Sequence, residues 1–210
     1  MKPGLGVIGV PRRRVDGRAM VTGQRKYADD LTLPRMAFAR LLRSPVPHAR
    51  ITSIDITRAA AHQGVLLVLT GKDLPIPYGI LPVTQDEHAL AIDKVRFVGD
   101  PVALIVARDE ATATDALDLV DVRYEPLTTI AGFDDALTVA EPRIHDYGAE
   151  GNVHKKVSLQ FGDVDAALAD ADQVFEDLFF YEGNTHLPLE QHATVAHLDG
   201  DGKLVVYSST

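Results

Sequence analysis

The chain has 210 residues, which is longer than one ordinary domain, and its 46% share of hydrophobic residues is enough for a packed core. Its formal net charge of -9 disfavours a nucleic-acid or anionic-membrane surface, because both attract clustered Lys and Arg. The absence of cysteine excludes disulfides, thiolate ligation of zinc or iron-sulfur clusters, and a cysteine nucleophile within this chain.

The N-terminal segment Met1–Thr32 is rich in glycine, arginine and turn formers, and it predicts an extended arm with turns at Asp16-Gly17 and Thr22-Gly23. We interpret Arg12–Arg14 as a solvated strip or a partner-docking tail rather than a phosphate or RNA site. The start lacks a signal-peptide pattern, and no apolar run approaches the ~20 residues that span a bilayer. We therefore expect a cytoplasmic location, with no membrane and no nucleic-acid partner.

From Met36 onward, short runs of apolar and β-branched residues are separated by proline and glycine breaks, which predicts strands at 36–44, 49–57 and 64–71. Thr57 precedes an alanine run that predicts a short, Thr-capped crossover helix ending before Gly64. A proline-rich loop, 74–82, follows. The order strand, helix, strand indicates layers of helix on sheet.

The same alternation returns more clearly over residues 95–127. Residues 101–107 are almost continuously apolar, as a strand buried on both faces requires. Residues 109–120 then predict a helix that starts near Asp109 or Thr112, and a strand follows at 121–124. This pattern favours an α/β (α+β) sandwich over an all-β barrel, and the acidic stretch 132–151 is typical of a linker.

The remainder predicts an incomplete second domain. Gly162-Asp163 begins a capped short helix, and the alternating residues 174–181 predict a strand. A hairpin is predicted from 193–198 to 203–207, around the turn sequence 199–202. Because the sequence stops within a strand, we expect an open sheet edge, covered either by a partner chain or by a longer continuation.

Few motifs in the sequence point to chemistry. GVIGV at 6–10 lacks the spacing of a dinucleotide-binding loop, and no GxSxG motif supports an independent hydrolase. The segment that holds His186, Glu190, His192 and His197 predicts a loop and then a strand, where the helical i,i+4 geometry of zinc motifs is unavailable. We therefore expect these residues to be bonded into a strand or loop rather than to bind zinc.

Two further groups of polar residues have simpler interpretations than a functional site. His145 and Asp146 fall in the linker, where we expect a solvated turn. A calcium loop is suggested by composition alone at four aspartates, for which a solvated helix face is expected instead: Asp163, Asp165, Asp170 and Asp172.

Three longer motifs carry a resemblance to a known family. RVDGRAMVTGQRKYADD at 14–30, RSPVPHARITSID at 43–55 and VRFVGDPVALIVA at 95–107 resemble the opening of the molybdopterin-binding large subunit of the xanthine dehydrogenase and aldehyde oxidase family. Within it, residues 79–96 and 161–164 are most similar to the alpha subunit of 4-hydroxybenzoyl-CoA reductase. The resemblance covers essentially the whole chain.

The resemblance implies a domain order. It divides the chain into an N-terminal arm (1–19), an α/β hammerhead domain (20–130), a linker (131–150) and the beginning of a molybdopterin-binding domain (151–210).

The resemblance also implies a candidate cofactor contact. EGNTHLPLE at 182–190 is similar to the segment in which a family glutamine hydrogen bonds to a ligand of molybdenum, and Asn184 stands at that position here. Asparagine keeps the amide donor but reaches about 1.5 Å less far. Asn184 and Thr185 are thus candidate cofactor-binding residues, or they only satisfy backbone groups in a turn. The resemblance places the catalytic glutamate further along a longer subunit, so no catalytic residue and no protein metal ligand is expected here.

The implied function is that of one part of a molybdenum-dependent oxidoreductase. The cofactor would be molybdopterin, as the cytosine dinucleotide, in the full assembly, with FAD and [2Fe-2S] clusters on partner subunits and nothing bound to the isolated chain, which would be inactive. The reaction would be reductive dehydroxylation of 4-hydroxybenzoyl-CoA to benzoyl-CoA. Two alternatives stay open: a non-catalytic scaffold or assembly subunit, or a related dehydrogenase that hydroxylates an N-heterocycle or an aldehyde.

Overall fold

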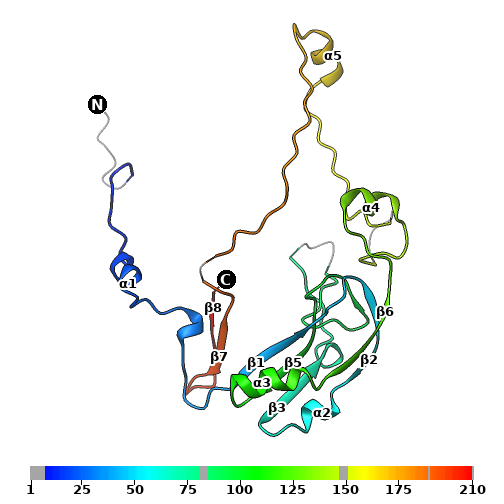
Figure 1. Ribbon diagram of the computed structural model, residues 1–210. Coiled ribbons are helices and arrows are strands. Elements are labelled where there is room, and N and C mark those ends of the chain that lie inside the picture. The colour runs from blue at the N-terminus through cyan, green and yellow to red at the C-terminus, as the bar shows by residue number, and fades with distance from the viewer. Residues whose placement is uncertain (1–7, 81–84, 147–150, 189, 210) are drawn as a thin grey trace. The chain divides into compact units, whose positions relative to one another are not determined.

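The computed structural model describes residues 8–80, 85–146, 151–188 and 190–209 (Figure 1). Its contacts divide the chain into two units, which we describe separately. The larger unit is Arg35–Phe175, and the smaller combines Met1–Pro34 with Glu176–Thr210. Pro82 of the predicted proline-rich loop and residues 147–150 of the predicted linker lie outside the described residues.

The first sheet of the larger unit has the order β1-β5-β3, with β5 antiparallel to both neighbours. Its strands are β1 (Phe38–Arg43), β3 (Val65–Thr70) and β5 (Pro101–Ala107). The neighbouring residues Val102 and Ala103 point to opposite faces, and both are fully buried. The prediction that this strand is buried on both faces is therefore confirmed.

The second sheet has the order β4-β2-β6, again with antiparallel pairs. It consists of β2 (Ala49–Asp55), β4 (Lys94–Val95) and β6 (Asp121–Pro126). A buried cluster joins Ala49 and Val95 of this sheet to Val102 of β5. This buried cluster thus joins the two sheets.

The short helices connect the two sheets. The helix predicted at Thr57 is confirmed, but it joins strands of different sheets rather than crossing over within one. Helix α2 (Thr57–Ala60) links β2 to β3, and α3 (Glu110–Leu117) links β5 to β6. Four residues of α-helix rise only about 6 Å, too little to return along a strand of about 20 Å. Thr57 is the first helical residue and not the cap, and its N–H donates to Asp55 Oδ1 at 2.9 Å.

Helix α3 packs against the first sheet, as Figure 1 shows. Asp109 is its N-cap and accepts a hydrogen bond from Thr112 N at 2.8 Å, which confirms the predicted start. Ala113 and Ala116 are fully buried on the inner face, and Ala116 belongs to a second core cluster with Ile105 of β5.

We expect Asp109→Ala to lower the thermal midpoint of unfolding by about 2–4 °C at neutral pH, because the first turn of α3 loses its cap. The backbone and side-chain hydrogen bonds from Thr112 lower the pKa of Asp109 below its ordinary value of 3.8. The cap's contribution is therefore complete above that ordinary value and is lost as pH falls through the lower one. Differential scanning calorimetry at pH 7 and pH 3 measures both effects. An equal deficit at both pH values would contradict the ionised cap.

Three further elements complete the larger unit: η2 (Gly71–Asp73), α4 (Phe133–Thr138) and α5 (Val164–Ala169). Asp163 caps α5 by accepting from Ala166 N at 3.0 Å, which confirms that predicted helix. The aspartates at 163, 165, 170 and 172 are all exposed.

The predicted strand at 174–181 is wrong. Within the described residues no strand of the chain pairs with this segment. Its large apolar side chains are strongly exposed, with Leu178 at 98% and Phe179 at 88%. A strand needs a neighbour to satisfy its backbone groups, so alternation alone does not make one here.

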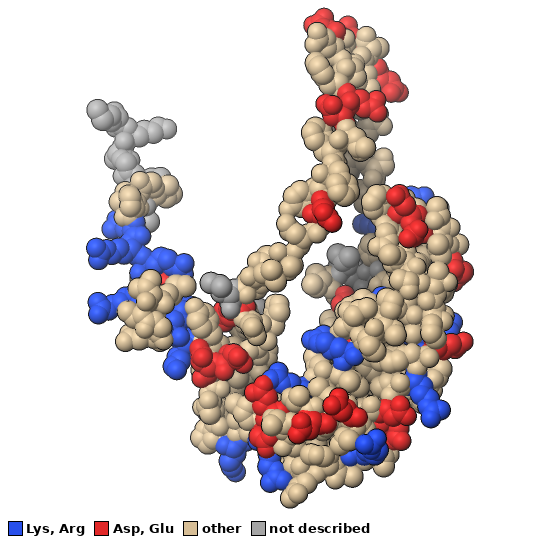
Figure 2. Space-filling model, in the orientation of Figure 1, with Lys and Arg blue, Asp and Glu red and all other residues tan. Residues whose placement is uncertain are grey.

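The smaller unit contains α1 (Gly17–Val21), η1 (Ala28–Asp30) and the antiparallel hairpin β7 (Thr194–Leu198) and β8 (Leu204–Ser208). The hairpin confirms the prediction. The predicted turn at Asp16-Gly17 lies one residue earlier, at Val15-Asp16, and leads directly into α1. Gly23, at φ +68°, ends α1 as a turn residue should. Figure 2 shows Lys and Arg gathered along the N-terminal segment, and Arg12–Arg14 are exposed. No described helix is long and apolar enough to cross a membrane.

Candidate cofactor-binding segment

Asn184 and Thr185 lie in the stretch that precedes β7, and both are exposed. Asn184 Nδ2 donates a hydrogen bond to the Tyr181 hydroxyl at 3.0 Å, and Thr185 Oγ1 accepts from Leu187 N at 3.5 Å. Leu187 has a φ of +40°, which bends the chain at this point. The two candidates, which are adjacent in the sequence, lie in an irregular stretch that bends at Leu187.

Asn184 has a hydrogen-bond donor available for a ligand, and exposed apolar side chains occur in the same stretch. A carboxamide has two N–H donors, and the bond to Tyr181 uses one of them. Large apolar side chains occur nearby in the sequence and are strongly exposed, with Phe180 at 83% and Leu187 at 79%. Apolar walls with a few polar groups are typical of cofactor sites. An amide N–H also suits the oxygen or sulfur acceptors around molybdenum, so these residues fit the group that the resemblance implies.

The histidines considered for zinc do not assemble. No group of three His, Cys, Asp or Glu side chains converges anywhere in the described ranges. His197 lies on β7, where its ring stacks on Tyr207 with centroids 6.1 Å apart, and its Nδ1 lies 3.1 Å from the Leu198 carbonyl oxygen. His197 is therefore bonded into its strand, as expected.

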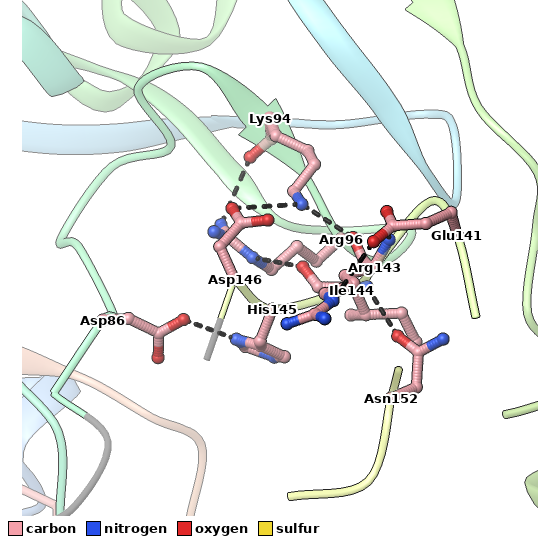
Figure 3. Close-up of polar contacts among 9 residues, drawn as sticks. All are labelled: Asp86, Lys94, Arg96, Glu141, Arg143, Ile144, His145, Asp146 and Asn152. Carbon is pink, nitrogen blue, oxygen red and sulfur yellow. Dashed lines mark hydrogen bonds and ion pairs between the residues drawn. The ribbon is translucent and has the colours of Figure 1, made fainter. Parts of the chain in front are cut away.

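A second polar cluster holds the predicted linker against the larger unit's second sheet (Figure 3). Lys94 Nζ donates to the Arg143 carbonyl at 2.7 Å, and Arg96 Nε donates to the Ile144 carbonyl at 2.9 Å. Asn152 accepts from Ile144 N at 2.8 Å and donates to the Val139 carbonyl at 2.7 Å. The charged side chains of Lys94 and Arg96 and the amide of Asn152 thus form hydrogen bonds with backbone groups of the linker.

His145 and Asp146 both contact this cluster, and the predicted solvated turn holds for the exposed Asp146 but not for His145, whose ring pairs with Asp86. His145 Nδ1 and Asp86 Oδ2 are 2.8 Å apart, and Asp146 Oδ2 lies 3.5 Å from Lys94 Nζ. Partner residues some 50 to 60 positions earlier in the chain hold both side chains, and sequence spacing gives no sign of such contacts. Asp146 itself stays 77% exposed, so its ion pair adds little.

Asp100 contacts the backbone of Arg96 in the same cluster. Its carboxylate accepts a hydrogen bond from Arg96 N at 2.9 Å, which holds the backbone of the arginine in place. Burial raises the pKa of Asp100, although this bond and the Arg96 charge oppose the shift.

Among the described residues, the larger unit has hollows of about 110 and 160 Å³, and both are smaller than the ~300 Å³ of ordinary ligand sites.

Sequence reasoning missed Lys94, Arg96 and Asn152. A signal exists for Lys94, because a lysine next to the fully buried Val95 in a short strand must find acceptors for its charge. Asn152 gives no such signal, since its partners are backbone groups.

Known protein families account for both parts of the chain. Residues 22–128 match the model described as aldehyde oxidase and xanthine dehydrogenase, a/b hammerhead domain. Residues 144–210 match the molybdopterin cofactor-binding domain. The chain belongs to the aldehyde oxidase and xanthine dehydrogenase family. The α/β fold class expected from the sequence, a hammerhead domain followed by the start of a molybdopterin-binding domain, is confirmed.

Relatives within the aldehyde oxidase and xanthine dehydrogenase family are longer than this chain. The nicotinate dehydrogenase large molybdopterin subunit of Eubacterium barkeri is 37% identical over 204 residues, which cover 97% of this chain and 47% of that subunit. The carbon monoxide dehydrogenase large chain of Afipia carboxidovorans is 35% identical over 207 residues, covering 91% and 26%. The chain therefore spans about half or less of the length of these relatives.

Solved structures agree with the sequence matches. The Cu,Mo-CO dehydrogenase superposes with a TM-score of 0.80 at 33% identity, over 96% of this chain and 27% of that one. The aldehyde oxidoreductase from Desulfovibrio gigas gives 0.81 at 28% identity, over 94% and 23%. The finer resemblance to 4-hydroxybenzoyl-CoA reductase stays a prediction, as do the domain boundaries near 19, 130 and 150.

Proposed function

We propose that the chain is the N-terminal part of the molybdenum-cofactor subunit of a multi-subunit molybdenum hydroxylase-type oxidoreductase. The observation that carries this proposal is the unbroken order of hammerhead sequence, 22–128, followed by cofactor-binding sequence, 144–210. In this proposal the hammerhead is a scaffold, and the isolated chain is inactive because the catalytic glutamate belongs to later sequence.

The proposed contribution of this chain to the site is one wall around the cofactor. Asn184 would donate an N–H to an acceptor near the metal, and Thr185 would fix the turn that presents it. When bound, the molybdenum cofactor, as the cytosine dinucleotide, supplies two-electron chemistry at an electron-poor carbon. The exposed apolar side chains in the same stretch as Asn184 would exclude water from that wall.

The proposed partners are the remainder of the large subunit, an FAD subunit and a [2Fe-2S] subunit. The absence of cysteine supports a separate cluster-bearing chain, because thiolates ligate such clusters. A relative with 32% identity is a complex subunit, the 6-hydroxypseudooxynicotine dehydrogenase complex subunit gamma of Paenarthrobacter nicotinovorans. The proposed location is the cytoplasm.

The proposed reaction is reductive dehydroxylation of 4-hydroxybenzoyl-CoA. Hydroxylation of an N-heterocycle is the second candidate, favoured by the 37% identity to a nicotinate dehydrogenase subunit. A scaffold or assembly role without catalysis is the third.

One purification separates these candidates. A tag on this chain in its native host should bring down a complex that contains molybdenum, iron and flavin. That complex should oxidise reduced viologen with 4-hydroxybenzoyl-CoA and leave nicotinate unchanged with an artificial acceptor. The reverse substrate result would select the heterocycle hydroxylase, and a metal-free, inactive species would select the scaffold.

Asn184 can be tested in the same complex. We expect Asn184→Ala to lower kcat about 10-fold with molybdenum content retained, because one donor toward the cofactor is lost. Asn184→Gln, which restores the family's longer amide, should keep at least wild-type kcat. The matched control is Gln173→Ala, an exposed amide outside the segment. Unchanged kcat in Asn184→Ala would assign the residue to the turn alone.

A further inference from the structure

A set of three side chains, Lys94, Arg96 and Asn152, fastens the segment Val139–Asp146, and we call this set the linker clamp (Figure 3). Every bond of the clamp to the segment other than the Lys94–Asp146 ion pair involves a backbone group: the carbonyls of residues 139, 143 and 144, and the N–H of residue 144. The contacts therefore fix the path of the chain rather than one particular side chain.

The Lys94 ammonium holds the segment through two acceptors. The Lys94 side chain is only 10% exposed, and an ammonium carries three N–H donors that need acceptors. The Arg143 carbonyl oxygen lies 2.7 Å from Lys94 Nζ, closer than Asp146 Oδ2 at 3.5 Å. If the segment lifted away, the Lys94 ammonium would lose both of these acceptors.

Asn152 closes the segment from its other end. Its carbonyl oxygen accepts from Ile144 N and its amide donates to the Val139 carbonyl, so one side chain bridges backbone positions five residues apart. Lys94 and Arg96 therefore tie the segment to the β4 region of the hammerhead, and Asn152 braces the segment internally.

We infer that the linker clamp locks the segment Val139–Asp146 onto the hammerhead sheet β4-β2-β6, so that the chain starts its cofactor-binding sequence from a fixed anchor on the hammerhead. Lifting the segment from the sheet breaks the bonds from Lys94 and Arg96, whereas Asn152 holds the shape of the segment by bridging Val139 and Ile144. This inference does not depend on the reaction that the full protein catalyses.

Limited trypsin digestion of the whole chain tests the clamp, because Arg143 lies inside it and supplies its own cleavage site. In the wild-type chain, cleavage after Arg143 should be slow compared with cleavage after the exposed Lys155. Lys94→Met should speed cleavage after Arg143 about 10-fold, the effect of losing one hydrogen bond from a charged donor. Cleavage after Lys155 should not change.

Two further variants make the result decisive. Lys72→Met removes an exposed lysine of the same unit and should leave both cleavage rates unchanged. Asn152→Ala should accelerate hydrogen exchange at the Ile144 amide, which loses its acceptor, and it serves as the test if Lys94→Met does not fold. Equal cleavage after Arg143 in wild type and Lys94→Met, or an unchanged Ile144 amide in Asn152→Ala, would overturn the inference.

Discussion

Replacing Ile105 by alanine should lower the free energy of unfolding by about 2–5 kcal/mol. Ile105 is fully buried at the centre of β5, where it packs with Ala59, Val68 and Ala116. Its three neighbours are either alanines or, for Val68, on a strand, so the surrounding atoms cannot collapse into the space left by the larger side chain. The loss therefore includes both the transfer of apolar atoms and a remaining cavity.

Urea denaturation of the whole chain, followed by circular dichroism, measures this effect. The control is Leu66→Ala on the neighbouring strand β3, where the side chain is 62% exposed. The control should change the unfolding free energy by less than about 0.5 kcal/mol. If both substitutions cost the same, the first sheet does not have the core described above.

Gly71→Ala should be nearly as damaging, by about 3 kcal/mol, at the upper end of the range for overpacking. A Cβ at this position would lie 2.6 Å from the Ala91 carbonyl oxygen and 2.7 Å from that of Leu90. Both atoms belong to the backbone of a segment that is itself buried. Neither can turn aside as a flexible side chain would, so the whole segment must shift.

Gly183→Ala provides the comparison for this second substitution. Its added Cβ would meet nothing within 4 Å, so the midpoint of urea unfolding should stay within error of the wild-type value. A midpoint for Gly71→Ala that matches Gly183→Ala would show that the η2 segment can move away from Leu90 and Ala91 at little cost.

The strands of the hammerhead follow from the sequence, but their partners do not. Apolar runs predict β1, β3 and β5, because each run is long enough to cross a core. Which strands pair depends on residues far apart, such as Phe38 opposite Ala107. The helix at Thr57 was predicted for the same local reasons, but the sequence did not show that the strands on either side of it belong to different sheets.

The candidate site shows a similar limit. Asn184 was found through the family resemblance, because an isolated asparagine in a turn has no distinctive spacing of its own. The linker clamp was missed because Lys94 and Arg96 bind carbonyl oxygens 48 or 49 positions away. Backbone acceptors are the same at every residue, so no motif marks them.

The interleaved strand pairing also affects the order in which the protein can fold during synthesis. The central strand of the first sheet, β5, begins only at Pro101, and the second sheet gains β6 only at Asp121. A nascent chain that has released β1, β2 and β3 from the ribosome still lacks a neighbour for each of them. The first sheet therefore cannot be complete before β5 has emerged, and the second sheet stays open to chaperones until β6 follows, when about 60% of the chain has emerged.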